Sequence, residues 1–133
     1  MEKPFFKIKK DKIKIIRNLK KLLLNSEKLN IKYFVIPLVD NSSIKNIEEE
    51  NIVVEFFNNI LDKFTKKINI LFEIDYDPIN LNRFIKRFKS NRFGINYDSG
   101  NSSSLGYDFD NEKIYYKYIK NFHIKDKRFK GDT

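Results

Sequence analysis

The sequence predicts an α/β domain built on a parallel sheet. Apolar runs of strand length alternate with longer segments in which apolar residues recur every three or four positions, a pattern typical of alternating strands and helices. The strand-length runs are apolar almost throughout, as expected for parallel strands covered on both faces. Charged or polar residues follow these runs, and such sheets carry their chemistry at the carboxyl ends of the strands. We therefore expect a single domain over residues 1–133, in the order α-β-α-β-α-β-α-β.

Four helices are expected where the apolar residues fall on one face at helical spacing. Asn30 suits the C-terminal end of the first helix, and Glu48, Glu49 and Glu50 place negative charge at the N-terminal end of the second. The expected helices span residues 9–30, 47–67, 81–90 and 112–118. The segments expected to be irregular are residues 1–7, the turn 75–78, the polar loop 98–110 and the tail 125–133.

Four strands are expected where β-branched and aromatic residues dominate a short apolar run. They span residues 31–38, 68–74, 93–97 and 119–124. Pro37 lacks the N–H that a ladder needs, so the pairing of the first strand is expected to stop near this residue. Parallel strands joined by helices imply right-handed crossovers, and four such units amount to about half of an eight-stranded barrel.

Composition and charge narrow the class of protein further. The chain has 133 residues, 41% of them hydrophobic, and no apolar run approaches the roughly 20 residues of a membrane span. Its N-terminus lacks the apolar core of a secretory signal, and the absence of cysteine excludes disulfide and thiol chemistry, which fits a cytoplasmic protein. The formal net charge is +9, but the lysines are spread over every expected helix. This distribution favours a solvated basic surface over a nucleic-acid partner.

Three potential metal ligands stand at matching positions in successive strand–helix units. Glu73, Asp98 and the single histidine, His123, come at or near the ends of three successive strands, at equal intervals of 25 residues. Carboxylate and imidazole groups suit a divalent cation, and the ends of parallel strands meet at one edge of a sheet. Two other interpretations stay open. A lone histidine at a strand end is more often a hydrogen-bonded structural residue, and Asp98 also suits the capping of the segment that follows it.

Six motifs occur in order and at the spacing of barrel repeats. They are M-E-K-P-F at the start, V-I-P-L-V-D-N-S-S-I at 35–44, L-F-E-I-D at 71–75, N-Y-D-S-G-N at 96–101, L-G-Y at 105–107 and H-I-K-D at 123–126. Together they resemble the sugar phosphate isomerase/epimerase family of the xylose isomerase-like TIM barrels, over essentially the whole chain. The resemblance implies a partial (β/α)8 TIM barrel of about four βα units with parallel strands, an internal fragment equivalent to strands four to seven of the barrel.

The resemblance also implies a metal site. Barrels of this family bind one divalent ion through a glutamate, an aspartate, a histidine and a second glutamate, and Glu73, Asp98 and His123 match the first three. The second glutamate belongs to the last strand of the barrel, which we expect to lie beyond this segment. Manganese, zinc, cobalt and magnesium all suit such ligands. Glu73 is in addition the expected catalytic residue, as the carboxylate that moves a proton.

The function that the resemblance implies is metal-dependent isomerisation or epimerisation of a sugar or sugar phosphate. Asn101 stands where related epimerases carry a substrate-contacting histidine. Lys125, Asp126 and Asp40 are further candidate substrate contacts, and alternation places Lys125 on the same strand face as His123. Asp40, at the end of the first strand, is expected to be either structural or a substrate contact.

Two alternatives remain at the level of the sequence. The related apurinic-site endonucleases cut DNA with a cluster of metals, but they need more histidines and carboxylates than this chain offers. A truncated barrel with three ligands and open strand edges would instead be non-catalytic, or would act only after self-association or together with a complementary half-barrel.

Overall fold

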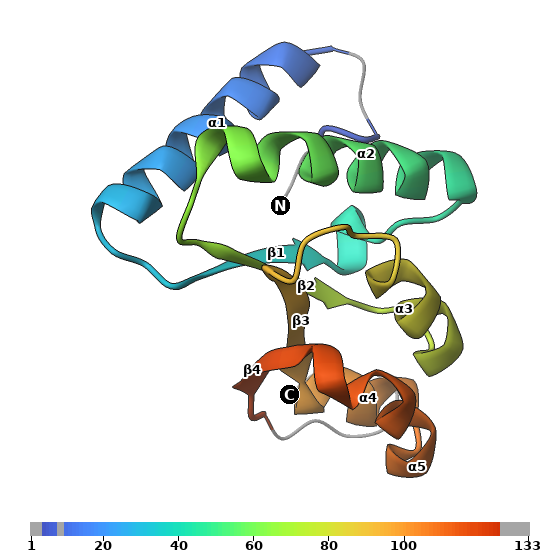
Figure 1. The fold of residues 1–133 in the computed structure, drawn as a ribbon. Helices are drawn as coiled ribbons and strands as arrows, with labels where there is room; N and C mark the ends of the chain where they lie inside the picture. The colour runs from blue at the N-terminus through green and yellow to red at the C-terminus, as the bar shows by residue number, and fades with distance from the viewer. Residues whose placement is uncertain (1–3, 8–9, 126–133) are drawn as a thin grey trace.

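Helices and strands alternate along the computed structural model, which describes residues 4–7 and 10–125 (Figure 1). The helices are α1 Lys12–Lys28, η1 Asp40–Ser42, α2 Ile47–Phe64, α3 Pro78–Ile85, α4 Ser99–Leu105, α5 Phe109–Glu112 and η2 Lys113–Tyr118, where η marks a 3₁₀-helix. The strands are β1 Tyr33–Leu38, β2 Asn69–Ile74, β3 Phe93–Asp98 and β4 Ile119–His123. This order confirms the α/β class. None of the helices described here is long and apolar enough to cross a membrane.

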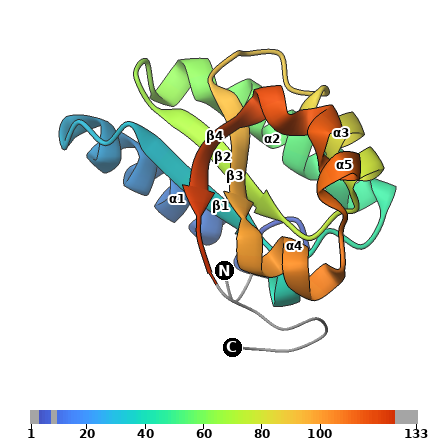
Figure 2. The same cartoon turned by 90° about the horizontal axis from the view of Figure 1, so that it is seen from below.

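The four strands form one parallel sheet in the order of the sequence, β1-β2-β3-β4. Figures 1 and 2 show α1, α2 and α3 on one face of this sheet. The ladder between β1 and β2 runs from Tyr33 opposite Asn69 to Leu38 opposite Ile74. It therefore ends one residue beyond Pro37, close to the expected stop.

A core rich in phenylalanine fills the space between the sheet and its helices. The ring of Phe72 in β2 is fully buried and lies 5.3 Å from Phe57 of α2, 5.4 Å from Phe84 of α3 and 4.7 Å from Phe88, between centroids. Each such ring pair adds about 0.5–1.5 kcal/mol to the effect of burial alone. Because successive side chains of a strand point to opposite faces, this anchoring of Phe72 directs its neighbour Glu73 away from the helices.

The end of α1 agrees with the sequence. Asn30 has φ 57°, the left-handed conformation in which asparagine commonly ends a helix. Its N–H donates to the carbonyl of Glu27 at 3.0 Å, and the N–H of Ile31 donates to that of Ser26 at 2.9 Å. These two bonds satisfy carbonyls that have no partner within the helix, and the chain then continues into β1.

The expected polar loop over 98–110 was wrong, because most of this segment is helical. Asp98 accepts a hydrogen bond from the N–H of Asn101 at 3.0 Å and caps α4, and Gly106 ends α4 with φ 73°. Serine, glycine and asparagine each have a low preference for the interior of a helix. Capping at both ends of α4 outweighs these low preferences. Asp108 caps α5 in the same way, by accepting from the N–H of Asp110.

Several bounds differ from the sequence-based expectation: α1 begins at Lys12 rather than at residue 9, α2 ends at Phe64 rather than at residue 67, and β1 begins at Tyr33 rather than at residue 31. The helix expected over 81–90 is α3, which begins three residues earlier because Asp77 caps it and Pro78 occupies its first turn. The helix expected over 112–118 is largely the 3₁₀-helix η2, preceded by the short α5.

Candidate metal centre

Three adjacent strands deliver the three predicted ligands to one edge of the sheet. Glu73 is the penultimate residue of β2, and Asp98 and His123 are the last residues of β3 and β4. Asp98 and His123 are direct partners in the ladder between β3 and β4. The carboxyl ends of parallel strands thus carry the site, as the sequence predicted.

A shift in register between β3 and β4 decides which face His123 occupies. Ile95 pairs with Ile119, but Asn96 pairs with Asn121, so Lys120 is an extra residue in β4. In a regular ladder Asp98 would stand opposite Phe122, and His123 would project from the other face of the sheet. The bulge therefore brings His123 to the face that carries Asp98.

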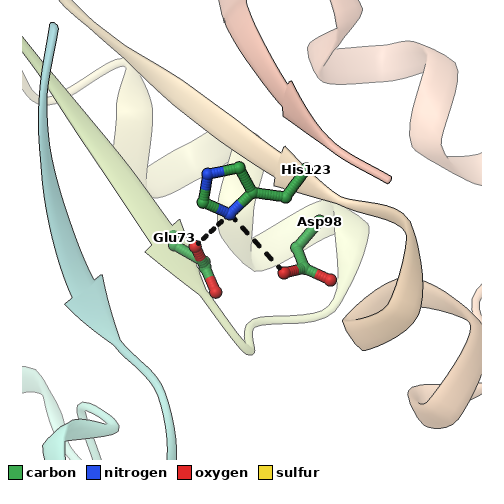
Figure 3. Close-up of side chains that lie close together, drawn as sticks. All are labelled: Glu73, Asp98 and His123. Atoms are coloured by element: carbon green, nitrogen blue, oxygen red, sulfur yellow. Dashed lines mark ion pairs between the residues drawn. The ribbon is translucent and has the colours of Figure 1, made fainter. Parts of the chain in front are cut away.

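The ligand atoms lie as close together as a shared cation requires (Figure 3). Nδ1 of His123 is 3.2 Å from Oε2 of Glu73 and 3.8 Å from Oδ2 of Asp98. One ligand atom of each residue lies within 4.8 Å of the others. Ligands about 2.1 Å from a cation stand about 3 Å apart at right angles and about 4.2 Å apart when opposite. The spacing and the mixture of donors therefore fit one divalent ion.

Two asparagine side chains hold Glu73 in this position. Nδ2 of Asn96 donates to Oε2 of Glu73 at 2.8 Å, and Nδ2 of Asn101 donates to Oε1 at 3.3 Å. Asn101 was predicted to contact the substrate, and the structure brings it to the site. Asn96 was missed by the sequence analysis, although its position two residues before Asp98 on the same strand face was a signal that could have revealed it.

Asp98 is almost completely buried, and its carboxylate is compensated by Lys125. The side chain of Asp98 is 1% exposed, and Nζ of Lys125 lies 2.6 Å from its Oδ2. The Lys125 ammonium therefore compensates the charge on Oδ2. Burial raises the pKa of Asp98, but the Lys125 ammonium and the Asn101 N–H lower it by more, and the pKa lies below its usual value. The same contact raises the pKa of Lys125.

The remaining predicted residues are not all at this site. Asp40 is exposed, begins η1 with φ 53° and takes no part in the group formed by the three ligands. Asp126 lies outside the described residues. Asp75, two residues after Glu73, binds neighbouring segments: its carboxylate accepts from Ser43 Oγ, and its carbonyl accepts from the Tyr107 hydroxyl at 3.3 Å.

A small cavity adjoins Glu73 and Asp98 on the side of α4. Its volume is about 30 Å³, and Glu73, Asn96, Asp98, Asn101, Tyr107 and Glu112 are among the residues that line it. The carboxylate of Glu112 accepts from the hydroxyls of Tyr97, Ser102 and Tyr115 at 2.7–2.8 Å. This cavity has room for about one water molecule and none for a sugar. The side chain of His123 is 41% exposed, so the three ligands are open to solvent on the side away from this cavity.

The fold and this group of side chains define a class: an α/β protein that gathers two carboxylates and an imidazole at the strand ends of a parallel sheet. The chain belongs to the xylose isomerase-like TIM barrel family, whose model matches residues 7–133. That family includes sugar isomerases and epimerases as well as apurinic-site endonucleases. The expectation of a partial TIM barrel is confirmed.

A solved structure has the same fold. It is the crystal structure of a xylose isomerase domain protein from Planctomyces limnophilus, which superposes with a TM-score of 0.69 at 13% sequence identity. The match covers 85% of this chain and 42% of that protein, so this chain spans less than half of its length. No curated protein sequence matches the chain.

Proposed function

We propose that this chain is the metal-binding part of an isomerase or epimerase that acts on a sugar or sugar phosphate. In this proposal Glu73, Asp98 and His123 bind one divalent ion. The observation that carries the proposal is the convergence of these side chains, from three adjacent strand ends, to within 4.8 Å of one another. Membership of the family supports it, because sugar isomerases and epimerases are among its members.

The chemistry requires a proton to leave the carbon beside a carbonyl and to return elsewhere. A divalent ion of manganese, zinc, cobalt or magnesium would stabilise the enediolate that develops in this reaction. Glu73 is the proposed proton-transfer residue. Its Oε2 lies 3.2 Å from Nδ1 of His123, while Oε1 accepts a long hydrogen bond, at 3.3 Å, from Asn101 and is the better placed to receive a proton.

Residues around the open side are the proposed substrate contacts. Asn101 presents its amide beside Glu73, and Lys125 presents an ammonium beside Asp98, where it suits a carbonyl, hydroxyl or phosphate oxygen. Asp126 and Asp40 stay candidates for such contacts on the grounds of the sequence alone.

We further propose that residues 1–133 form a single partial-barrel domain that functions with additional βα units. Both flanks of the sheet support this proposal. Beyond β4, an apolar groove of about 370 Å³ is lined by Tyr97, Phe109, Tyr116, Ile119 and Phe122. Beyond β1, α1 carries the exposed apolar side chains Ile13, Leu22 and Leu24. A complementary half-barrel or a second copy of the chain could cover these surfaces and supply a further ligand.

Metal titration of the full chain tests the ligand set. We expect one Mn²⁺ per chain by calorimetry, and at least about tenfold weaker binding in each of Glu73→Gln, Asp98→Asn and His123→Gln. Glu48→Gln, which removes an exposed carboxylate at the start of α2, is the matched control and should bind as the parent does. Equal affinity in the parent and in the three ligand variants would contradict the proposal.

Proton exchange tests the reaction. In D₂O with Mn²⁺, sugar phosphates of the correct class should exchange the hydrogen beside their carbonyl, as detected by NMR, and Glu73→Gln should abolish this exchange. Metal binding without exchange in any such substrate would identify the isolated chain as non-catalytic. Nicking of abasic DNA would favour the endonuclease, although the single histidine of the sequence argues against a multi-metal centre.

A further inference from the structure

The buried carboxylate of Glu112 lines the same small cavity as Glu73 and Asp98. Glu112 is the last residue of α5 and is 5% exposed. Three hydroxyl groups donate to it: those of Ser102 and Tyr115 to Oε1, at 2.7 and 2.8 Å, and that of Tyr97 to Oε2, at 2.8 Å. These donors belong to α4, η2 and β3, so one carboxylate joins three elements to α5.

The two tyrosine hydroxyls keep their protons and therefore act as steady donors. Burial, followed by the bond to Glu112, raises the pKa of Tyr115, and burial likewise raises the pKa of Tyr97. Tyr115 is itself only 2% exposed. Loss of the carboxylate would thus leave a buried hydroxyl without its acceptor, which is unfavourable enough to make the surrounding elements shift.

The helix α4 depends on such contacts because its own sequence hardly favours a helix. It reads S-G-N-S-S-S-L, and its 7 residues are too few for a helix that is stable by itself. Ser102 lies in the middle of α4, and its neighbour Asn101 makes the two bonds that reach the site. The N–H of Asn101 donates to Oδ1 of Asp98 at 3.0 Å, and its Nδ2 donates to Oε1 of Glu73 at 3.3 Å.

We propose that Glu112 is a positioning residue, which holds α4 in place through Ser102 and so keeps the amide of Asn101 against Glu73. Ser102 and Asn101 are consecutive residues of one short helix, so a movement of the first moves the second. The bond from Asn101 to Glu73 is already long at 3.3 Å, and a small displacement would break it. The consequence for metal binding rests on the proposed function, whereas the hold on α4 does not.

Glu112 acts in this arrangement as a hydrogen-bond acceptor rather than as a charge. A hydroxyl can both donate and accept, so a glutamine could serve at this position. Its amide oxygen would accept from Ser102 and Tyr115, and its NH₂ group would donate to the hydroxyl of Tyr97. A leucine has no acceptor. Glu112→Gln and Glu112→Leu therefore separate a positioning role from one that needs a negative charge, such as metal ligation or proton transfer.

Amide hydrogen exchange of the metal-free full chain, followed by NMR, tests the hold on α4. In Glu112→Leu and Ser102→Ala the N–H of Asn101 should exchange at least about tenfold faster than in the parent. The N–H of Ile70, which donates to the carbonyl of Arg92 within the sheet, should accelerate less. The side-chain amide signals of Asn101, assigned by their absence from Asn101→Ala, should shift in both variants. Glu112→Gln should match the parent in exchange and in these signals.

The affinity for Mn²⁺ supplies the second measurement. Glu112→Leu and Asn101→Ala should each bind Mn²⁺ about tenfold more weakly than the parent. The double variant should bind no more weakly than the weaker single variant, because both changes remove the same contact with Glu73. Glu50→Gln is the control: it alters a carboxylate that is equally well buried but joins α2 to Arg83 of α3, so it should keep the affinity and the Asn101 signals of the parent.

Unchanged exchange at Asn101 in both Glu112→Leu and Ser102→Ala would overturn this inference. Additive losses of affinity in the double variant, or a Glu112→Gln that behaves like Glu112→Leu, would also overturn it. If Glu112→Leu does not fold, Ser102→Ala and Glu112→Gln still decide the point. Failure of the parent to bind Mn²⁺ would instead overturn the proposed function, and the exchange data from the metal-free chain would still decide the role of Glu112.

Discussion

Among the individual residues, Asp98 combines three contacts: it caps α4, lies near His123 and pairs with Lys125. Its Oδ1 caps α4 through the N–H of Asn101, and its Oδ2 lies among the ligand atoms, with Lys125 beside it. The capping interpretation, which the sequence left open, is confirmed. It does not exclude ligation, because the two oxygens face different partners.

Replacement of Lys125 by methionine should reveal how Oδ2 is compensated. The variant keeps the aliphatic stem but leaves a buried carboxylate without its cation, which should lower the free energy of unfolding by about 1–2 kcal/mol in metal-free buffer. Saturating Mn²⁺ should restore much of this loss, because the ion supplies the missing positive charge. Thermal or urea unfolding with and without Mn²⁺ measures both effects.

The control for this prediction is Lys113→Met. Lys113 also pairs with an aspartate, Asp110, but both side chains are well exposed, so the variant should change stability by less than about 1 kcal/mol, with or without Mn²⁺. An equal decrease in the free energy of unfolding in the two lysine variants would show that the burial of Asp98 does not strengthen its pairing with Lys125.

At the scale of the elements, the bulge in β4 is the feature that assembles the site. The aliphatic part of the Lys120 side chain packs directly on Gly94 of β3. A side chain at position 94 would have its Cβ only 2.7 Å from Cδ of Lys120. Nζ of Lys120 donates to Oδ1 of Asn69 at 3.0 Å. The extra residue thus has its own contacts on β2 and β3. The equal 25-residue spacing in the sequence identified three residues whose side chains the structure brings within 4.8 Å of one another, but it contains no information on this shift.

Deletion of Lys120 should restore a regular ladder and turn His123 to the opposite face. We expect at least about tenfold weaker binding of Mn²⁺, with the loss of one ligand and of the hydrogen bond that Asn121 donates to Asn96. Lys120→Met keeps the chain length and the stem, so it should keep the metal affinity while it loses the bond to Asn69. Calorimetry on both variants, after circular dichroism has established that they fold, decides the question. Unchanged binding in the deletion variant would show that the bulge is dispensable.

At the scale of the whole molecule, a buried ion-pair cluster joins α2 to α3. Glu50 is 1% exposed and accepts two bonds from Arg83 at 2.6 Å, one from Arg87 and one from the Tyr76 hydroxyl at 2.8 Å. Burial raises the pKa of Glu50, but these partners lower it by more, so the pKa lies below its ordinary value of 4.5. The chain carries a net charge of +9, and the carboxylate of Glu50 offsets part of the repulsion between Arg83 and Arg87.

The contribution of Glu50 to stability should depend on pH. Because its pKa is depressed in the folded state, the stabilisation is complete above the unfolded value of 4.5 and is lost as the pH falls through the lower folded value. Glu50→Gln should therefore cost about 2–3 kcal/mol at about pH 7, somewhat less than in fully buried pairs because the arginines are partly exposed. Urea unfolding from about pH 7 to about pH 3 should show this difference shrinking with acid. Glu48→Gln, on the same helix but exposed, should cost less than about 1 kcal/mol at about pH 7.

The sequence by itself determined the class of fold, the alternation of elements and the three residues that converge. These features follow from apolar periodicity, which is a local property of the sequence, and from the general rule that the carboxyl ends of parallel strands meet at one edge of a sheet. Only the tertiary structure decided the helix over 99–105, the pairing of Lys125 with Asp98 and the role of Asn96. The helix depends on capping at both of its ends, which outweighs the weak helix preference of its residues. The other two features depend on contacts between strands, whose register shifts by one residue at a bulge that no sequence pattern indicates.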